Sequence, residues 1–162
     1  MLTQESNNRK GSTKLKFQLP RSTLYYIIMI LTPQQIFGTM RKAGFPNDIE
    51  VSPGVSVAVC MTAIALRESG GDQYAFNGDV LTSDRSYGLL QINMLALGAY
   101  WGPFGLNKER DLFKPAVNAH AGFVLWGGNN NNLNVAWYID KPGYKEAYEA
   151  ELPAAQAAAK AG

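Results

Sequence analysis

The segment VSVAVCMTAIALRES, residues 55–69, constrains the fold more than any other part of the chain. Before its last three residues the segment carries no charge, so a helix formed here is apolar on nearly all sides. Such a helix is buried at the centre of a domain. Gly70 and Gly71 follow directly and predict where the helix ends. The sequence therefore predicts a central helix whose last turn carries two charged side chains, Arg67 and Glu68.

Other segments predict helices that pack around this central one. Thr32 is the expected N-cap of a first helix, with Pro33 at its first position and Gly44 at its end. Also expected are a turn at 45–54, helices over 88–101, 112–126 and 143–162, and a short helical or irregular piece at 136–138. The last helix should break at Pro153, and residues 72–88 should form a loop or a small hairpin. The predicted fold class is mainly α, with at most a small β hairpin.

The chain has 162 residues, which fits a single domain with a core of its own. Its net charge of +2 is unevenly placed: residues 1–23 hold five basic and one acidic side chain, a net +4, and the remainder carries −2. A nucleic-acid-binding fold carries basic residues along its helices and strands. The body lacks that pattern, so specific nucleic-acid binding is not expected. The basic end is expected to be a solvated tail or to touch an anionic surface.

Residues 1–31 are predicted to be an appendage, with a basic tail over 1–23 and the apolar segment LYYIIMIL at 24–31. Eight apolar residues are too few to cross a bilayer as a helix, so no transmembrane span is expected. This segment is instead expected to dock on a partner or to pack as a strand. The patterned body covers residues 32–152, and residues 153–162 form an Ala-rich C-terminal end.

The cysteine and histidine content gives little support to metal chemistry. The chain contains one Cys and one His, which are too few for a transition-metal site. Cys60 lies inside the apolar segment and is expected to be a small buried side chain, and a single Cys excludes an intramolecular disulfide. The stretch DVLTSDRS lacks the spacing of a calcium-binding loop. No metal and no cofactor is therefore expected.

Glu68 is the candidate catalytic residue. It stands at the C-terminal end of an apolar helix, where burial and the negative end of the helix dipole both favour the protonated carboxyl group. A protonated carboxyl group is what a general acid offers to a glycosidic oxygen. Arg67 is expected to point elsewhere, because neighbouring residues face apart on a helix. The alternative is a surface Glu that closes the helix, with or without a salt bridge.

The segment that follows Glu68 carries side chains suited to a sugar. Gly88 is expected to let the backbone approach a bound ring, because glycine has no Cβ atom. The amides of Gln91 and Asn93 suit hydroxyl and N-acetyl groups, and Ser86 lies just before them in the sequence. These polar residues are therefore candidates for substrate binding.

Aromatic and acidic residues complete the candidate site. Tyr87, Trp137 and Tyr138 offer flat apolar faces for pyranose rings, although core packing is the commoner role of aromatic residues. Asp79 and Asp84 are the available second carboxylates, although Asp in a loop more often stabilises a turn. The residue types alone leave both interpretations open.

The pattern ALRESGG…SYGLLQIN resembles the signature of the soluble lytic transglycosylases and the goose-type lysozymes. That signature places Glu-Ser at the end of a buried helix, then a loop, then Gly-Leu-(Met/Leu/Phe)-Gln-(Ile/Val). The stretch from LTPQQIFG to ALRESGGD is similar to the lead-in helices of phage and actinobacterial members. LFKPAVNAHAGFVLW resembles their LFDP-x-x-N-x-x-A helix, and AWYIDKPGYKEAY resembles their closing segment. The resemblance covers about residues 32–150.

The resemblance implies a lysozyme-like fold that acts on peptidoglycan and cleaves the β-1,4 bond between N-acetylmuramic acid and N-acetylglucosamine. Glu68 matches the catalytic acid of the family. The substrate-binding residues, implied by the resemblance or argued above, are Ser69, Ser86, Tyr87, Gly88, Leu90, Gln91, Asn93, Trp137 and Tyr138. The expected partner is the glycan strand of peptidoglycan, bound without a metal or a cofactor.

The chain departs from the goose-type pattern in its carboxylates. Asn93 stands where those enzymes carry Asp, and neither Asp79 nor Asp84 aligns with their second carboxylate. With one carboxylate, the resemblance favours a lytic transglycosylase, in which the 6-hydroxyl group of muramic acid closes a 1,6-anhydro ring. The alternatives are a hydrolysing lysozyme that uses Asp79 or Asp84, and a non-catalytic virion structural protein with a lysozyme fold.

The resemblance to phage members also implies a setting. The expected location is a phage virion, as a tail or internal protein that acts at the bacterial cell wall. The alternative is a phage endolysin released to the periplasm. In a virion, residues 1–31 are the expected contact with other phage virion or tail proteins.

Overall fold

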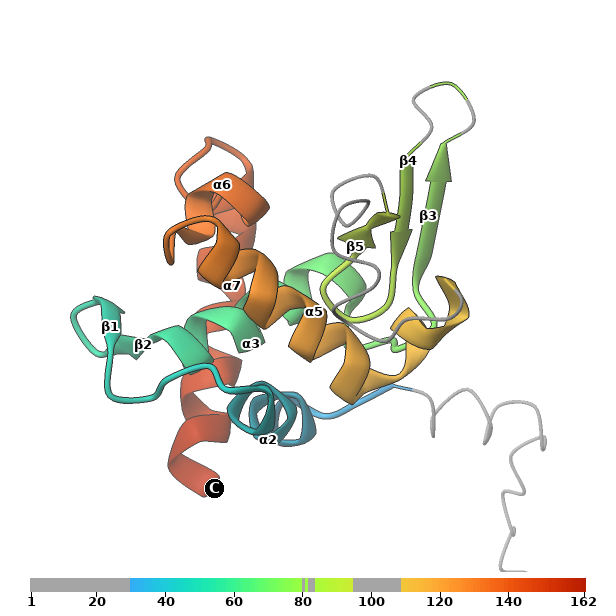
Figure 1. Cartoon of the computed structure of the whole chain (residues 1–162). Helices are drawn as coiled ribbons and strands as arrows, with labels where there is room; N and C mark the ends of the chain where they lie inside the picture. The colour runs from blue at the N-terminus through green and yellow to red at the C-terminus, as the bar shows by residue number, and fades with distance from the viewer. Residues whose placement is uncertain (1–29, 80, 82–83, 95–108) are drawn as a thin grey trace, which may run out of the picture.

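The computed structural model describes residues 30–79, 81, 84–94 and 109–162. These residues form a mainly α fold with two small antiparallel sheets (Figure 1), which confirms the predicted fold class. The helices are α2 (Pro33–Ala43), α3 (Val57–Ser69), the 3-10 helix η1 (Glu109–Phe113), α5 (Pro115–Gly128), α6 (Leu133–Trp137) and α7 (Tyr144–Ala161). No helix among the described residues is both long enough and apolar enough to cross a bilayer.

Helix α3 is the centre of the core, as its composition predicts. Its first nine residues are all buried, and both α2 and α7 pack against it (Figure 1). Each large apolar side chain buried in this way stabilises the fold by about 1.5–3 kcal/mol. The Ser56 hydroxyl caps the first turn by accepting a hydrogen bond from the Val59 N–H at 3.2 Å. The helix ends at Gly70, whose φ of 61° turns the chain away directly after the turn that carries Glu68.

Helix α2 begins and ends where the sequence predicts. Thr32 is its N-cap and Pro33 its first residue, and the Gln35 side chain completes a capping box by accepting the Thr32 N–H at 2.9 Å. Gly44 ends the helix with a φ of 111°. Ile36 lies fully buried in the core, so the capped helix is also held by its apolar face.

Helix α7 runs through Pro153, so the predicted break at this residue is wrong. A proline inside a helix removes one backbone hydrogen bond and crowds the preceding turn, at a cost of about 3 kcal/mol. The helix continues because the core holds both of its halves. Tyr148 is buried before the proline, and Ala155 and Ala158 are buried after it. Packing against α2 and α3 therefore outweighs the local preference of Pro153.

Two small sheets contain the described strands. Strand β1 (Glu50–Ser52) pairs with β2 (Val55–Ser56) just before α3, where the sequence predicted only a turn. Strands β3 (Phe76–Asp79), β4 (Asp84–Tyr87) and β5 (Ile92–Asn93) form an antiparallel sheet in the order β3-β4-β5. The small hairpin expected after α3 is therefore present, with a third strand added to it.

The predicted helix over residues 88–101 is wrong over residues 88–93. After Tyr87 the chain makes a tight turn and continues as β5, with Tyr87 opposite Ile92 in the sheet register. Gln91 has a φ of 45°, a left-handed conformation that an α-helix does not allow. Residues 95–101 lie outside the described part of the chain.

Asn118 of α5 holds this turn in place. Its side chain is fully buried, and its Oδ1 accepts a hydrogen bond from the Leu90 N–H at 2.8 Å. Its Nδ2 donates to the carbonyl oxygens of Tyr87 at 2.7 Å and Leu112 at 3.0 Å. Gly88 has a φ of 71°, and a Cβ atom there would lie 2.5 Å from Asn118 Nδ2. Gly88 thus lets the backbone approach the protein interior closely.

The described chain begins at the end of the predicted docking segment. Ile30 forms an isolated antiparallel bridge with Asp72, and the Leu31 N–H donates to the Gly71 carbonyl oxygen at 2.9 Å. These contacts place the start of the described chain beside the loop that follows α3. The predicted basic tail and most of the docking segment, residues 1–29, lie outside the described residues.

Replacing Asn118 with Leu removes all three of its hydrogen bonds while the side-chain volume stays similar. Because three backbone groups then lose their hydrogen bond to this buried side chain, we expect the free energy of unfolding to fall by about 3 kcal/mol. Urea denaturation followed by circular dichroism measures this change. Asn129→Leu, at the end of the same helix, is the control. Asn129 donates one hydrogen bond, to the Leu125 carbonyl oxygen at 2.8 Å, and should cost about 1 kcal/mol or less. Equal losses would contradict the role of Asn118.

Cys60 gives the fold a pH dependence. Burial raises the pKa of its thiol from 9.0 to about 11, and a hydrogen bond with Tyr148 partly opposes this shift. The folded state then holds the thiol proton more tightly than the unfolded state, so stability falls as the pH rises from 9 to about 11. We expect Cys60→Ala to remove about 1 kcal/mol of this fall at pH 10. Urea denaturation of both proteins across this range measures the difference, and parallel curves would show that the pKa is not raised.

Candidate active site

A pocket of about 930 Å³ opens beside the end of α3. One wall is the β3–β4–β5 sheet, and the other is formed by the end of α5, by α6 and by the start of α7. Its volume is within the range of about 300–1,000 Å³ that is usual for small-molecule sites. The predicted site residues that line it are Glu68, Ser69, Asp84, Ser86, Leu90, Gln91, Asn93, Trp137 and Tyr138.

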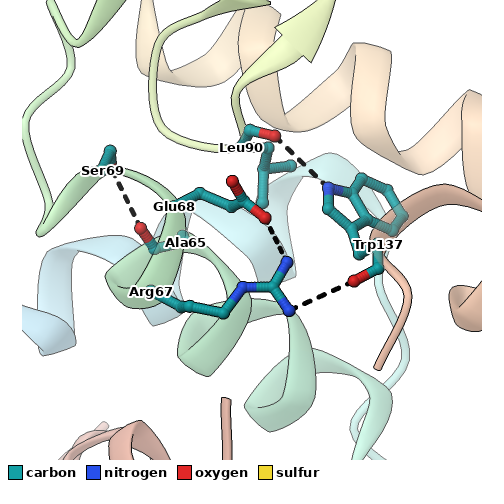
Figure 2. Close-up of polar contacts among 6 residues, drawn as sticks. All are labelled: Ala65, Arg67, Glu68, Ser69, Leu90 and Trp137. Carbon is teal, nitrogen blue, oxygen red and sulfur yellow. Dashed lines mark hydrogen bonds and ion pairs between the residues drawn. The ribbon is translucent and has the colours of Figure 1, made fainter. Parts of the chain in front are cut away.

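Arg67 forms an ion pair with Glu68, so the prediction that it points elsewhere is wrong (Figure 2). Its Nη2 donates to Glu68 Oε1, and its Nη1 donates to the carbonyl oxygen of Trp137 at 3.1 Å. The guanidinium carbon also lies 5.4 Å from the ring centre of Tyr144. The long Arg67 side chain reaches its neighbour because these contacts from α6 and from α7 hold its far end.

This ion pair restricts the Glu68 carboxyl group at the end of α3. The pair keeps the Glu68 side chain beside the Arg67 guanidinium in the lining of the pocket. The Arg67 side chain is 8% exposed and that of Glu68 is 23% exposed, so water and salt screen the pair only in part. The pocket therefore contains a carboxyl group in a fixed orientation, which proton transfer to or from a bound substrate requires.

Trp137 joins α6 to the turn that forms the floor of the pocket. Its indole N–H donates to the Leu90 carbonyl oxygen at 3.3 Å, and its own carbonyl oxygen accepts the hydrogen bond from Arg67 (Figure 2). Leu90 packs tightly on α5, where a Cβ atom on Gly122 would lie 2.4 Å from Leu90 Cδ1. With only 5% of its surface exposed, Trp137 is a fixed part of the wall rather than an open stacking surface.

Tyr138 is the predicted aromatic residue that the pocket exposes most. Its φ of 53° ends α6 and turns the chain, and its side chain is 51% exposed. Tyr144 lines the same pocket, with the two ring centres 5.9 Å apart. Tyr144 was not predicted as a site residue, because its position depends on the conformation of the turn between α6 and α7.

Polar side chains on the sheet wall form a connected group. Asp84 Oδ1 accepts hydrogen bonds from Ser86 Oγ at 2.8 Å and from Asn93 Nδ2 at 2.6 Å, and all three residues line the pocket. The Gln91 side-chain amide donates to the carbonyl oxygens of Ala75 at 3.1 Å and of Gly88 at 3.0 Å. The sheet wall therefore faces the pocket with polar groups whose orientation is set by their neighbours.

Tyr87 lies behind this wall and does not line the pocket. It is 5% exposed, and its ring packs against Phe76 and Phe113 with ring centres 4.9 Å and 5.5 Å away. Its hydroxyl donates to Glu109 Oε2 at 2.6 Å. Of the two roles that the sequence left open for Tyr87, this placement matches core packing.

Asp79 and Ser69 have structural bonds of their own. Asp79 lies at the far end of the hairpin, outside the pocket lining, and its Oδ1 accepts a hydrogen bond from the Leu81 N–H at 2.8 Å. Ser69 lines the pocket, but its hydroxyl donates to the Ala65 carbonyl oxygen at 2.9 Å (Figure 2) and accepts the Gly71 N–H at 3.2 Å. Asp79 thus stabilises a turn, and Ser69 closes α3.

The structure adds pocket residues that the sequence did not single out. They are Ala75, Phe76, Asn77, Ile92, Leu125, Gly128, Asn129, Val135, Ala136 and Tyr144. Phe76 is 55% exposed and lies over Gly78, where a Cβ atom would meet its ring at 2.6 Å. A lone aromatic residue in an otherwise polar strand was the available signal for this position. Phe76 therefore offers an apolar surface on the sheet wall, facing the pocket.

A double-mutant cycle of Arg67→Met and Glu68→Met measures how strongly the two side chains are coupled. Because both are largely buried, we expect a coupling free energy of about 1–3 kcal/mol. The surface pair Lys145–Glu149, 3.9 Å apart and about half exposed, is the matched control. Its coupling should be about 0.5 kcal/mol or less. Urea denaturation of the proteins in each cycle gives both values, and equal couplings would show that the pair at Glu68 is an ordinary surface contact.

A family model described as a lysozyme-like domain matches residues 43–143 of the chain. The match spans more than half of the sequence and includes Glu68 and every residue that lines the pocket except Tyr144. Searches of curated proteins and of solved structures gave no match. The chain belongs to the family of lysozyme-like domains, and this membership supports a peptidoglycan-cleaving glycosidase as its general activity.

Proposed function

We propose that the protein is a lytic transglycosylase, which cleaves the bond between N-acetylmuramic acid and N-acetylglucosamine, with Glu68 as general acid and then as base. The observation that carries this proposal is the position of Glu68, a carboxyl group held by Arg67 in the wall of the pocket. Among the described residues, Asp84 is the other carboxylate that lines the pocket, and its Oδ1 already accepts two hydrogen bonds. A mechanism that uses one carboxyl group as both acid and base fits this arrangement.

The proposed reaction has two steps and consumes no water. In the first, the Glu68 carboxyl group gives its proton to the glycosidic oxygen while the bond between that oxygen and C1 of muramic acid breaks. The neighbouring N-acetyl group stabilises the oxocarbenium-like centre that forms at C1. In the second step, Glu68 accepts the proton of the muramic acid 6-hydroxyl group, whose oxygen bonds to C1. The product is a 1,6-anhydro sugar.

Arg67 supports the second step of this cycle. Its guanidinium holds the Glu68 side chain in one orientation, so the carboxylate left after the first proton transfer is placed to accept the next proton. For the first step the carboxyl group must be protonated.

The two walls of the pocket offer contacts suited to N-acetylated sugars. Phe76 on the sheet wall and Tyr138 on the helical wall are each about half exposed, and their rings suit the apolar faces of pyranose rings. Asn77 and Asn129 add amide groups, which pair well with hydroxyl and N-acetyl groups. These contacts support a glycan strand as the occupant.

A hydrolysing lysozyme is the second candidate, because Asp84 lines the same pocket as Glu68. In that reaction the second carboxylate activates a water molecule or attacks the sugar carbon. Asp79 is a weaker choice for this role, since it lies outside the pocket lining and bonds within its own turn. The hydrolytic alternative therefore depends on Asp84.

The setting that we propose is the bacterial cell wall, with the protein as a phage virion component or as an endolysin. Support comes from the peptidoglycan substrate of the family and from the resemblance of the sequence to phage members. In a virion, residues 1–31 would provide the contact with other virion or tail proteins. A virion protein without catalytic activity is the remaining alternative.

Mass spectrometry of the fragments released from purified peptidoglycan tests the reaction. We expect anhydro-muramyl products, one water lighter than their hydrolysed counterparts. Glu68→Gln should lower their rate of formation by about 10²- to 10⁴-fold, because a general acid contributes a factor of that size. Gln keeps the shape of Glu68 and a side-chain oxygen that can accept the bond from Arg67.

Asp84→Asn is the matched control, since it neutralises the other carboxylate of the pocket. It should leave the chemical nature of the product unchanged. Reducing-end products that disappear in Asp84→Asn would establish the hydrolase instead. Equal amounts of product from the wild-type protein and Glu68→Gln would rule out Glu68 as the acid. Absence of any product from the folded wild-type protein would favour the non-catalytic role.

A further inference from the structure

The turn between α6 and α7 brings three side chains together at the rim of the pocket. Tyr138 and Tyr144 both line the pocket and are 51% and 43% exposed. Lys141 lies between them in the sequence, with its ammonium nitrogen 5.3 Å from the ring centre of Tyr138 and 5.2 Å from that of Tyr144. We call these three residues the rim cluster.

The backbone of the turn fixes the rim cluster. The Lys141 N–H donates to the Tyr138 carbonyl oxygen at 2.9 Å, and the Tyr144 N–H donates to the Lys141 carbonyl oxygen at 3.0 Å. Gly143 allows the turn because its φ is 84°. An ammonium group is attracted to aromatic faces, so the two rings restrict the Lys141 side chain before any ligand arrives. The entropic cost of ordering it on binding is therefore reduced.

The Lys141 ammonium group is not used in an ion pair with any described residue. Ion pairs among the described residues include Arg67–Glu68, Arg85–Glu109, Lys114–Asp111 and Lys145–Glu149. Arg67, the other cation close to the Tyr144 ring, is paired with Glu68. Asp140 is adjacent in sequence and exposed, but it forms no ion pair with Lys141. The charge of Lys141 is thus available to an anion that enters the pocket.

Peptidoglycan carries anions that a chain of N-acetylglucosamine lacks. Each muramic acid bears a lactyl group, whose carboxyl group is either free or linked to a stem peptide with carboxylates of its own. A chain of N-acetylglucosamine has the same rings and the same N-acetyl groups but no carboxylate. A fixed cation at the rim of the pocket can therefore distinguish the two polymers by charge.

We propose that the rim cluster is a binding subsite for a carboxylate of the muramyl strand, with Lys141 binding the anion and with Tyr138 and Tyr144 holding Lys141 in place. This inference rests on the proposed function only in taking peptidoglycan as the substrate, and it does not depend on the reaction product. The pocket then prefers anionic muramyl strands over neutral strands of equal length. Added salt reduces this preference, because the rim is exposed to solvent.

Binding is measured by calorimetry in the Glu68→Gln protein, so that the ligands stay intact. The ligands are three tetrasaccharides: a muramyl strand with stem peptides, a peptide-free muramyl strand with free lactyl carboxylates, and a chain of N-acetylglucosamine. Lys141→Met removes the charge and keeps an apolar side chain between the rings. We expect it to weaken binding of the muramyl strands about three- to fivefold, as for a partly exposed ion pair, with a smaller effect on the neutral chain.

Two further variants separate charge from structure. Lys141→Arg keeps the cation and should restore most of the affinity. Lys145→Met makes the same change four residues further on, at a lysine that pairs with Glu149 on the surface of α7, and should not alter binding of any ligand. Both variants are made in the Glu68→Gln protein, so all affinities are directly comparable.

If Lys141→Met loses more affinity for the peptide-bearing strand, the stem carboxylates are the anions that Lys141 binds. If it loses more affinity for the peptide-free strand, the lactyl carboxylate is that anion. An equal loss of affinity for all three ligands in Lys141→Met, or no loss for either muramyl strand, would contradict the proposed subsite. If the Glu68→Gln protein still binds muramyl strands in that case, the proposed substrate stands without the subsite. If it binds no muramyl strand at all, the subsite and the proposed substrate fail together.

Discussion

The geometry of the pocket depends on the buried amide of Asn118. Its oxygen accepts a hydrogen bond from the Leu90 N–H, and the Leu90 carbonyl oxygen accepts one from the indole N–H of Trp137. The Trp137 carbonyl oxygen in turn accepts a hydrogen bond from the Arg67 guanidinium, which also donates to Glu68. A series of hydrogen bonds thus runs from α5, through the turn after β4 and the end of α6, to the end of α3. Each is worth only about 1 kcal/mol, but together they fix the orientation of one carboxyl group.

Local signals in the sequence predict the central helix and the ends of α2, because capping residues and glycines act within a few positions of themselves. The errors have non-local causes. Residues 88–93 carry apolar side chains that suit a helix, but their turn is fixed by Asn118, which lies 28 residues beyond Leu90. Pro153 should end a helix, but burial of the alanines that follow it keeps α7 continuous. Tertiary contacts therefore outweigh local preference at both places.

In the candidate site, too, the sequence predicts the features that depend on local signals and misses those that depend on distant contacts. The position of Glu68 follows from an apolar helix that ends at two glycines, so the sequence predicts it. Its ion pair with Arg67 could not be predicted, because Trp137 and Tyr144, which hold Arg67, come from the far end of the chain. Gly88 belongs to the family signature, but it packs against the interior and not against the pocket. A signature therefore marks where a site lies without separating residues that contact the ligand from residues that support the fold.

Leu90 takes part in the series of hydrogen bonds only through its backbone, donating its N–H and offering its carbonyl oxygen. Every amino acid except proline has both groups, so the identity of the side chain at this position is not tied to the orientation of Glu68. The Leu90 side chain nevertheless lines the pocket. Replacements that fit against Gly122 can alter the surface presented to a ligand and leave the carboxyl group aimed as before. Ligand preference and proton transfer can therefore evolve separately in this fold.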